Sequence, residues 1–245
     1  MRLLAAVFFL AFVLPASGAD GRMYAVLSLV GDQLLISQRG VSTGSRLDRN
    51  TREFVRLAGP AFDHEALFAI EDAIKRSGKG VEVVLLGTND PALFEAQRRV
   101  LDEEGSTQTL LSAVQAVAAS ASATHLILLS KYRGDARLRV ADGHVGAGTL
   151  EGLGFYLDHT SRMRSAHTGE QSQGFIAPFA YMRLSLVELP GGKLLREENV
   201  TASTTVASQK SDATWQILTA EQKARILRGL IRREIDRVIP LLLAP

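Results

Sequence analysis

The sequence contains no cysteine among its 245 residues. Disulfide bonds, thiol catalysis and thiolate metal sites are therefore excluded. A bacterial lipoprotein carries its lipid on an N-terminal cysteine, so we expect the mature protein not to be a lipoprotein. An exported domain without disulfide bonds is more typical of a bacterial periplasm than of a small eukaryotic secreted protein.

The sequence also lacks an excess of charge of one sign. Its 28 lysine and arginine residues nearly balance its 26 aspartate and glutamate residues, which leaves a formal net charge of +2. A protein that binds nucleic acid usually carries a basic excess, so we expect no nucleic-acid partner. Hydrophobic residues make up 46% of the chain and charged residues 22%, a composition typical of a globular domain with a core of useful size.

Long hydrophobic runs are missing except at the start of the chain. Residues 3–14 are apolar, follow the positive charge of Arg2, and precede small residues of the kind that a signal peptidase reads. This pattern predicts a secretory signal peptide over residues 1–19, cleaved before Asp20, and export to the periplasm. Residues 20–245 then form a single domain, in which no apolar segment is long enough for a transmembrane helix.

The most ordered pattern in the chain is a predicted hairpin over residues 179–204. Apolar residues alternate along its first half, and Pro190-Gly191-Gly192 supplies the backbone dihedral angles of a tight turn. One face of the first strand is predicted to carry Ala180, Met182, Leu184 and Leu186. Such a hairpin is marginal alone and needs further strands or a covering helix.

Other periodic segments supply both. Strands are predicted over residues 23–30, 33–38, 51–57, 81–86, 124–129 and 155–159, and helices over 63–76, 92–103, 107–121 and 219–242. We therefore expect an α+β fold, or an α/β fold with a mixed sheet. In either case a central mixed or antiparallel sheet contains the long C-terminal hairpin, and the helices pack on it.

Polar residues indicate the ends of these elements. Asp63, Asp90 and Thr219 are predicted to cap the helices that follow them. The glycine-rich residues 143–154 are predicted to form bulges and turns. Residues 39–50 and 161–174 are polar and predicted to be loops, the second of them mobile. These two loops are the expected interaction surfaces.

Two short blocks, residues 31–34 (GDQL) and 87–90 (GTND), each follow an apolar strand. Together they resemble the first and third blocks of the GDSL/SGNH hydrolase family. The resemblance implies that the side chain of Asn89 would help to form an oxyanion hole. It also implies a nucleophilic serine directly after the Gly-Asp pair.

Gln33 occupies the position of that serine, and an amide cannot act as the acyl-transfer nucleophile. The late Asp-x-x-His motif of the family is absent as well. We therefore expect no catalytic residues, and a hydrolase or an inactive relative is the alternative. In that alternative the site residues would be Asp32, Asn89 and Asp90.

The five histidines do not show the spacing of metal ligands on a helix. His144, His159 and His167 flank predicted loops, where scattered polar residues are common. The glycine-rich segment lacks the Gly-Lys-Ser/Thr ending of a phosphate loop. We therefore expect neither a metal site nor a cofactor.

The last predicted helix carries a stripe of apolar residues with arginines around the rest of its surface. The stripe consists of Leu227, Leu230, Ile231, Ile235, Val238 and Ile239. Packing of the stripe on the sheet is the main interpretation. Weak contact of the arginines with an anionic membrane surface is the alternative.

The hairpin sequence MRLSLVELPGGKLLREENVTAS is similar to the hairpin of CsgG-like and LpoB-like periplasmic domains, and the similarity extends over residues 121–205. It implies an α+β domain of the proteobacterial cell envelope. Together with the signal peptide, this predicts a non-catalytic binding or assembly module. Its partner would be an envelope protein or a small ligand.

Overall fold

A computed structural model describes residues 22–40, 50–77, 81–119, 121–140, 143–164, 171–189, 191–207 and 211–244. Its strands are β1 (Met23–Ser28), β2 (Gln33–Gln38), β3 (Thr51–Arg56), β4 (Glu82–Leu86), β5 (His125–Lys131), β6 (Arg133–Asp135), β7 (Leu138–Val140), β8 (Gly143–Val145), β9 (Thr149–Arg164), β10 (Gln171–Glu188), β11 (Lys193–Ser203) and β12 (Val206–Ala207). Its helices are α1 (Ala61–Ser77), α2 (Pro91–Leu101), α3 (Thr107–Ala119), the 3-10 helix η1 (Ser211–Ile217) and α4 (Ala220–Leu242). The signal-peptide prediction lies outside these residues, and the single domain over 20–245 stays a prediction.

The strands confirm an α+β fold with a large mixed sheet, in which β10 is the central strand. One edge of β10 pairs with β9 and then with β5, and its other edge pairs with β12 and β11. Beyond β5 lie β1 and β4, all three parallel, while beyond β9 lie β2, parallel to β9, and the antiparallel edge strand β3. The predicted hairpin corresponds to the antiparallel pair of β10 and β11.

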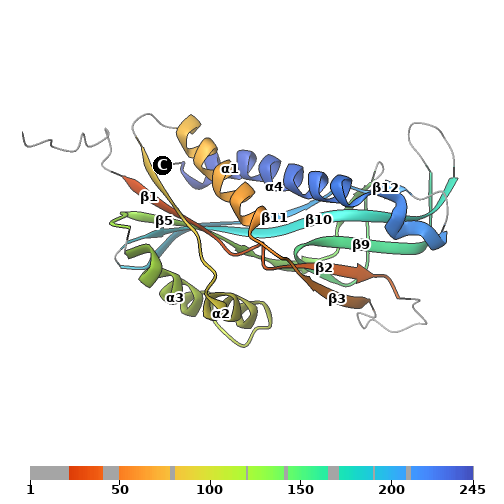
Figure 1. Cartoon of the computed structure of the whole chain (residues 1–245), viewed down its shortest axis with the longest axis horizontal. Coiled ribbons are helices and arrows are strands. Elements are labelled where there is room, and N and C mark those ends of the chain that lie inside the picture. The colour runs from red at the N-terminus through yellow and green to blue at the C-terminus, as the bar shows by residue number, and fades with distance from the viewer. Residues whose placement is uncertain are drawn as a thin grey trace, which may run out of the picture.

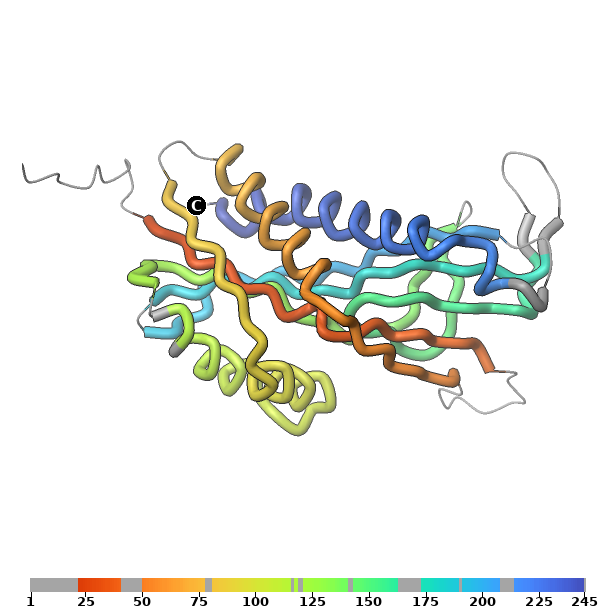
Figure 2. Tube along the Cα trace, in the orientation of Figure 1, coloured from red at the N-terminus to blue at the C-terminus, as the bar shows by residue number. Residues whose placement is uncertain are grey.

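Gly31 and Asp32 do not fold β2 back onto β1. The trace runs from β1 into β2 along the sheet, as Figure 2 shows in red and orange. As a result β1 pairs with β4 and β5 in one half of the sheet, and β2 pairs with β3 and β9 in the other half. The two strands therefore share a sheet without being neighbours.

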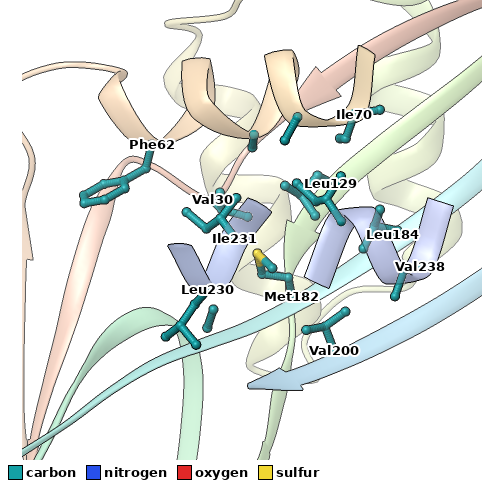
Figure 3. Close-up of a cluster of buried hydrophobic side chains, with 14 of the residues drawn as sticks. Val30, Phe62, Ile70, Leu129, Met182, Leu184, Val200, Leu230, Ile231 and Val238 are labelled. Atoms are coloured by element: carbon teal, nitrogen blue, oxygen red, sulfur yellow. The ribbon is translucent and has the colours of Figure 1, made fainter. Parts of the chain in front are cut away.

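Both faces of the sheet are covered. Helices α1 and α4 lie on one face, and α2 and α3 lie on the other (Figure 1). Figure 3 shows the buried side chains where α1 and α4 pack on the sheet, among them Ile70 from α1, Ile231 from α4 and Met182 from β10. The apolar stripe of the last helix is buried in this cluster, as predicted. On the same face as α2 and α3, the strands β7 and β8 cover the aromatic side chains of β9 and β10.

Three sequence predictions are wrong in detail. Residues 161–174 are not simply a loop, because β9 continues to Arg164 and β10 begins at Gln171; residues 165–170 lie outside the part that the structure describes. The glycine-rich segment is only partly a turn, since β9 begins at Thr149. A side chain at Gly154 would overlap the carbonyl oxygen of Leu35, so glycine permits β2 and β9 to pair here.

The third error is the cap of α1, which begins at Ala61, so Asp63 is an internal residue of the helix. The other two caps are confirmed. Asp90 accepts a hydrogen bond from the backbone of α2, and Thr219 and Gln222 form a capping box at the start of α4. No helix in the described ranges is long and apolar enough to cross a membrane.

Candidate functional site

The parallel strands β4, β1 and β5 end at the same edge, and a cleft of about 370 Å³ lies beyond them. In sheets of this kind, ligands bind in the crevice outside the carboxyl ends of the strands. We call this hollow the strand-end cleft. Its walls include Asp32, Asn89, Phe94, Gln97, Lys131 and Glu151. A neighbouring hollow of about 310 Å³ shares Pro60, Asp63, Thr88 and Asn89 with it.

Gln97 explains why β1 and β5 separate at this point. The last direct ladder bond between them runs from the amide of Leu29 to the carbonyl of Leu129, at 2.9 Å. The next ladder bond would join the Lys131 amide to the Leu29 carbonyl. Instead, the Gln97 side chain donates to the Leu29 carbonyl and accepts from the Lys131 amide, each at 2.8 Å. The buried side-chain amide of Gln97, which belongs to α2, thus lies between the two strands and replaces this ladder bond.

Asp63 ties α1 to the end of β1. One oxygen of its buried carboxyl group accepts hydrogen bonds from the Ser28 hydroxyl at 2.6 Å and from the amides of Val30 and Gly31 at 3.0 and 3.1 Å. Burial raises the pKa of Asp63 above its ordinary value, and the nearby charge of Asp32 acts in the same direction. The three hydrogen bonds act against this rise. A carboxyl group with a raised pKa beside a cleft is a common feature of functional sites.

Three charged side chains of the cleft, Asp32, Lys131 and Glu151, already take part in ion pairs. Lys131, whose side chain is only 5% exposed, forms an ion pair with Asp32. The buried carboxylate of Glu151 pairs with Arg52 at 2.9 Å and with Arg133 at 2.5 Å. These pairs compensate the charges that the fold takes out of water. A ligand would therefore meet a rigid, polar surface of low net charge.

The structure brings together two of the three residues of the hydrolase alternative. Asp32 and Asn89 both line the strand-end cleft, so the two blocks do converge in space. The side chain of Asp90 instead accepts a hydrogen bond from the amide of Ala92 at 2.9 Å and caps α2. Gln33 lines the same cleft but begins a strand, β2.

The four histidines that the structure describes do not gather at the cleft. His64 lines the neighbouring hollow, while His125 lies at the start of β5, the opposite end of that strand from the cleft. His144 lies in β8 and His159 in β9, and His167 is outside the described residues. Within the described ranges, no three histidine or acidic side chains lie close enough to hold a metal ion.

Sequence reasoning missed Gln97, Lys131 and the role of Asp63. A signal existed for Gln97, because it lies four residues after Leu93 on the stripe that α2 buries. A polar residue at such a position needs a hydrogen-bond partner inside the protein. Lys131 similarly ends a strand that is otherwise largely apolar. Neither signal identifies the partner, which lies far away in the sequence.

The bases of the two predicted interaction loops lie together. Arg39 donates to Asp158 at 2.8 Å and to the Ser161 hydroxyl at 2.9 Å. Burial alone would raise the pKa of Asp158, but hydrogen bonds from Ser161 and Arg39 hold it at about 2. Residues 41–49 and 165–170 are outside the described ranges, so the role of these loops stays a prediction.

Comparisons with known proteins give only remote similarities. No protein-family model matches the chain, and no curated protein matches it in sequence. Among solved structures, protein XCC0632 from Xanthomonas campestris, of family DUF330, is 8% identical with a TM-score of 0.41, over 91% of this chain and 83% of that one.

Two further structures are similar at the same level. A Helicobacter pylori homologue of a neuraminyllactose-binding hemagglutinin is 9% identical with a TM-score of 0.41, over 92% of this chain and 87% of that one. Hypothetical protein CT253 from Chlamydia trachomatis is 11% identical with a TM-score of 0.35, over 91% of this chain and 99% of that one. TM-scores this low do not bear on function.

Proposed function

We propose that this protein is an exported, non-catalytic binding module of the cell envelope, and that the strand-end cleft holds a small polar ligand. The observation that carries the proposal is the position of the cleft, at the carboxyl ends of three parallel strands. Its volume lies within the range of about 300–1,000 Å³ that is usual for small-molecule sites.

The chemistry of the walls supports binding. Lys131 and Glu151 are held in ion pairs, while Asn89 is exposed at the rim and offers both a donor and an acceptor. Phe94 adds an apolar surface to the wall. A pocket with apolar surface and a few fixed polar groups is typical of a small-molecule site.

Blocking the cleft with a bulky side chain should abolish ligand binding. Gly59 lines the cleft, and a Cβ atom added there meets no atom within 4 Å, so Gly59→Trp adds a large ring at the wall of the cleft without a clash at Cβ. The assay is thermal unfolding with amino acids, dipeptides and monosaccharides as probes. We expect at least one probe to raise the Tm of the wild type by about 5 °C at about a hundredfold excess over its Kd.

The matched control is Gly229→Trp, which adds the same ring at an open site on α4. It should keep the full thermal shift, whereas Gly59→Trp should lose it. An equal shift in both variants would place the ligand elsewhere, and no shift with any probe would contradict the proposal.

A hydrolase or an inactive relative is the second candidate, favoured by the convergence of Asp32 and Asn89 in the cleft. Hydrolysis of p-nitrophenyl acetate by the mature protein distinguishes the two. If the protein turns this ester over and loses the activity in Asn89→Ala or Asp32→Ala, the second candidate replaces the first.

Export is supported by the pattern of residues 1–19. When the full chain is expressed in a Gram-negative host, we expect a periplasmic protein whose first residue is Asp20. Mass spectrometry of the intact protein from the periplasmic fraction measures this directly. Recovery of the uncleaved chain from the cytoplasm would refute the export prediction.

A further inference from the structure

A further hollow lies between the β7–β8 hairpin, the end of β11 and the middle of α4. Its volume is about 420 Å³, and it shares no lining residue with the strand-end cleft. We call it the arginine pocket. Its lining includes Arg137, Arg139, His144, Thr201, Ser203 and Arg233.

The arginine pocket is strongly positive. Three arginines line it, and Glu234 is its one acidic residue, which leaves two positive charges when His144 is neutral. The Glu234 carboxylate is already shared between Arg233 at 3.2 Å and Arg237 at 2.9 Å. Within the described ranges, the side chains of Arg137 and Arg139 form no ion pair. Their charge is therefore available to an anion from solution.

The backbone of the pocket is fixed by its own hydrogen bonds. The Arg137 amide donates to the buried hydroxyl of Tyr181 at 2.9 Å, and the Arg139 amide donates to the Ser203 hydroxyl at 2.9 Å. The Thr205 hydroxyl donates to the Arg139 carbonyl at 2.8 Å. These bonds fix the backbone of both arginines on one wall of the pocket. Less backbone conformational entropy is therefore lost when a ligand binds.

The side chains around the pocket can donate hydrogen bonds to the oxygens of a phosphate group. A guanidinium group can donate two parallel hydrogen bonds to a phosphate, and Arg is preferred over Lys where this geometry matters. The Ser203 hydroxyl accepts from the Arg139 amide, so its own proton remains available to a ligand oxygen. The pocket is also as large as typical small-molecule sites, of about 300–1,000 Å³.

We propose that the arginine pocket binds the phosphate group of a small phosphorylated molecule. The two net positive charges of the pocket fit a phosphate monoester, which carries a charge of about −1.5 to −2 at neutral pH. The site lies outside the strand-end cleft and does not depend on the function proposed for that cleft.

Calorimetric titration of the mature protein with glycerol 3-phosphate tests this proposal. The double substitution R137Q/R139Q should weaken binding by about tenfold or more, because charge-assisted hydrogen bonds to the phosphate are lost. The control R225Q/R228Q removes the same charge from exposed positions on α4 outside the pocket and should bind as the wild type. Gly59→Trp should also bind glycerol 3-phosphate normally, which separates this site from the cleft.

A second arm uses vesicles of phosphatidic acid, a lipid with a phosphate monoester, mixed with phosphatidylcholine, and tests whether the phosphate group can come from a lipid. Flotation of the wild type with these vesicles, lost in R137Q/R139Q but kept in R225Q/R228Q, would support the site with a lipid headgroup as its ligand. Two results would overturn the proposal: no binding of either probe by the wild type, or equal losses in the two double variants.

Discussion

Gln97→Leu should lower the free energy of unfolding by about 2–6 kcal/mol, because it leaves two buried backbone groups without partners at about 1–3 kcal/mol each. These groups are the Leu29 carbonyl and the Lys131 amide, which the Gln97 amide joins. Leucine has a similar size and keeps the apolar packing of α2. The loss should therefore reflect hydrogen bonding, and urea denaturation of the two proteins measures it.

Two further variants make this measurement specific. Gln108→Leu changes an exposed glutamine of α3 and should alter stability by less than about 0.5 kcal/mol. Gln97→Glu at neutral pH places a buried charge against the Leu29 carbonyl, whereas its protonated form can donate to that carbonyl as the amide does. Its defect relative to the wild type should therefore shrink in acid.

If Gln97→Leu lowers the free energy of unfolding by less than about 1 kcal/mol, the Gln97 side chain does not hold β1 and β5 apart as inferred. Such a result would mean that β1 and β5 close up and form the missing ladder bond directly. The strand-end cleft would then narrow in the variant.

Asp63→Ala should lower the free energy of unfolding by about 3–5 kcal/mol, because three hydrogen bonds to one buried carboxyl group are lost together. Ser28 and the amides after β1 would lose their acceptor. Asp63→Asn should behave differently, since its side-chain carbonyl can still accept hydrogen bonds from these donors without a buried charge. Thermal and urea unfolding of both variants measure the contrast.

The pH dependence of Asp63→Asn follows from the direction of the pKa shift. Burial raises the pKa of Asp63 above its ordinary value of 3.8. As the pH rises from that ordinary value through the raised pKa, the buried carboxyl group ionises less readily than in the unfolded chain, and the folded protein loses stability. Below the ordinary value, the carboxyl group is protonated in both the folded and unfolded chain. Asp63→Asn should thus gain stability over the wild type between acidic and neutral pH and show no such gain in strong acid.

The control for this series is Asp72→Asn, an exposed carboxyl group on the same helix, which should differ from the wild type by less than about 0.5 kcal/mol. A loss of stability in Asp63→Asn at neutral pH would show that the charge itself stabilises the fold. Burial would then not be the dominant effect on this carboxyl group.

The sequence pattern predicts most elements because it records which face of each is buried. The alternation along β10 and the stripe along α4 correspond to the clusters found in the structure. The pattern fails at residues 161–164 and 171–174, which are largely polar in sequence and belong to the strands β9 and β10. A strand without an apolar face has no period of two in hydrophobicity, so a polar loop is the natural interpretation.

The candidate site was only half predictable for a related reason. Asp32 and Asn89 follow apolar strands, and turns at strand ends often carry function. The contacts of Gln97 and Asp63 depend on the order of strands in the sheet, which local pattern does not contain. Asp63 lies more than thirty residues from all three of its donors, and its position after Pro60 is equally typical of a cap.

The central strand β10 has a mechanical consequence. Over Met182–Glu188 it is paired along both edges, with β5 and with β11, and toward its start it pairs with β9 and β12. One continuous strand thus spans both halves of the sheet, so the halves cannot hinge against each other without breaking its ladders. Any local opening of the molecule would be confined to the elements around β10. The amide protons of β10 should be among the last to exchange with solvent.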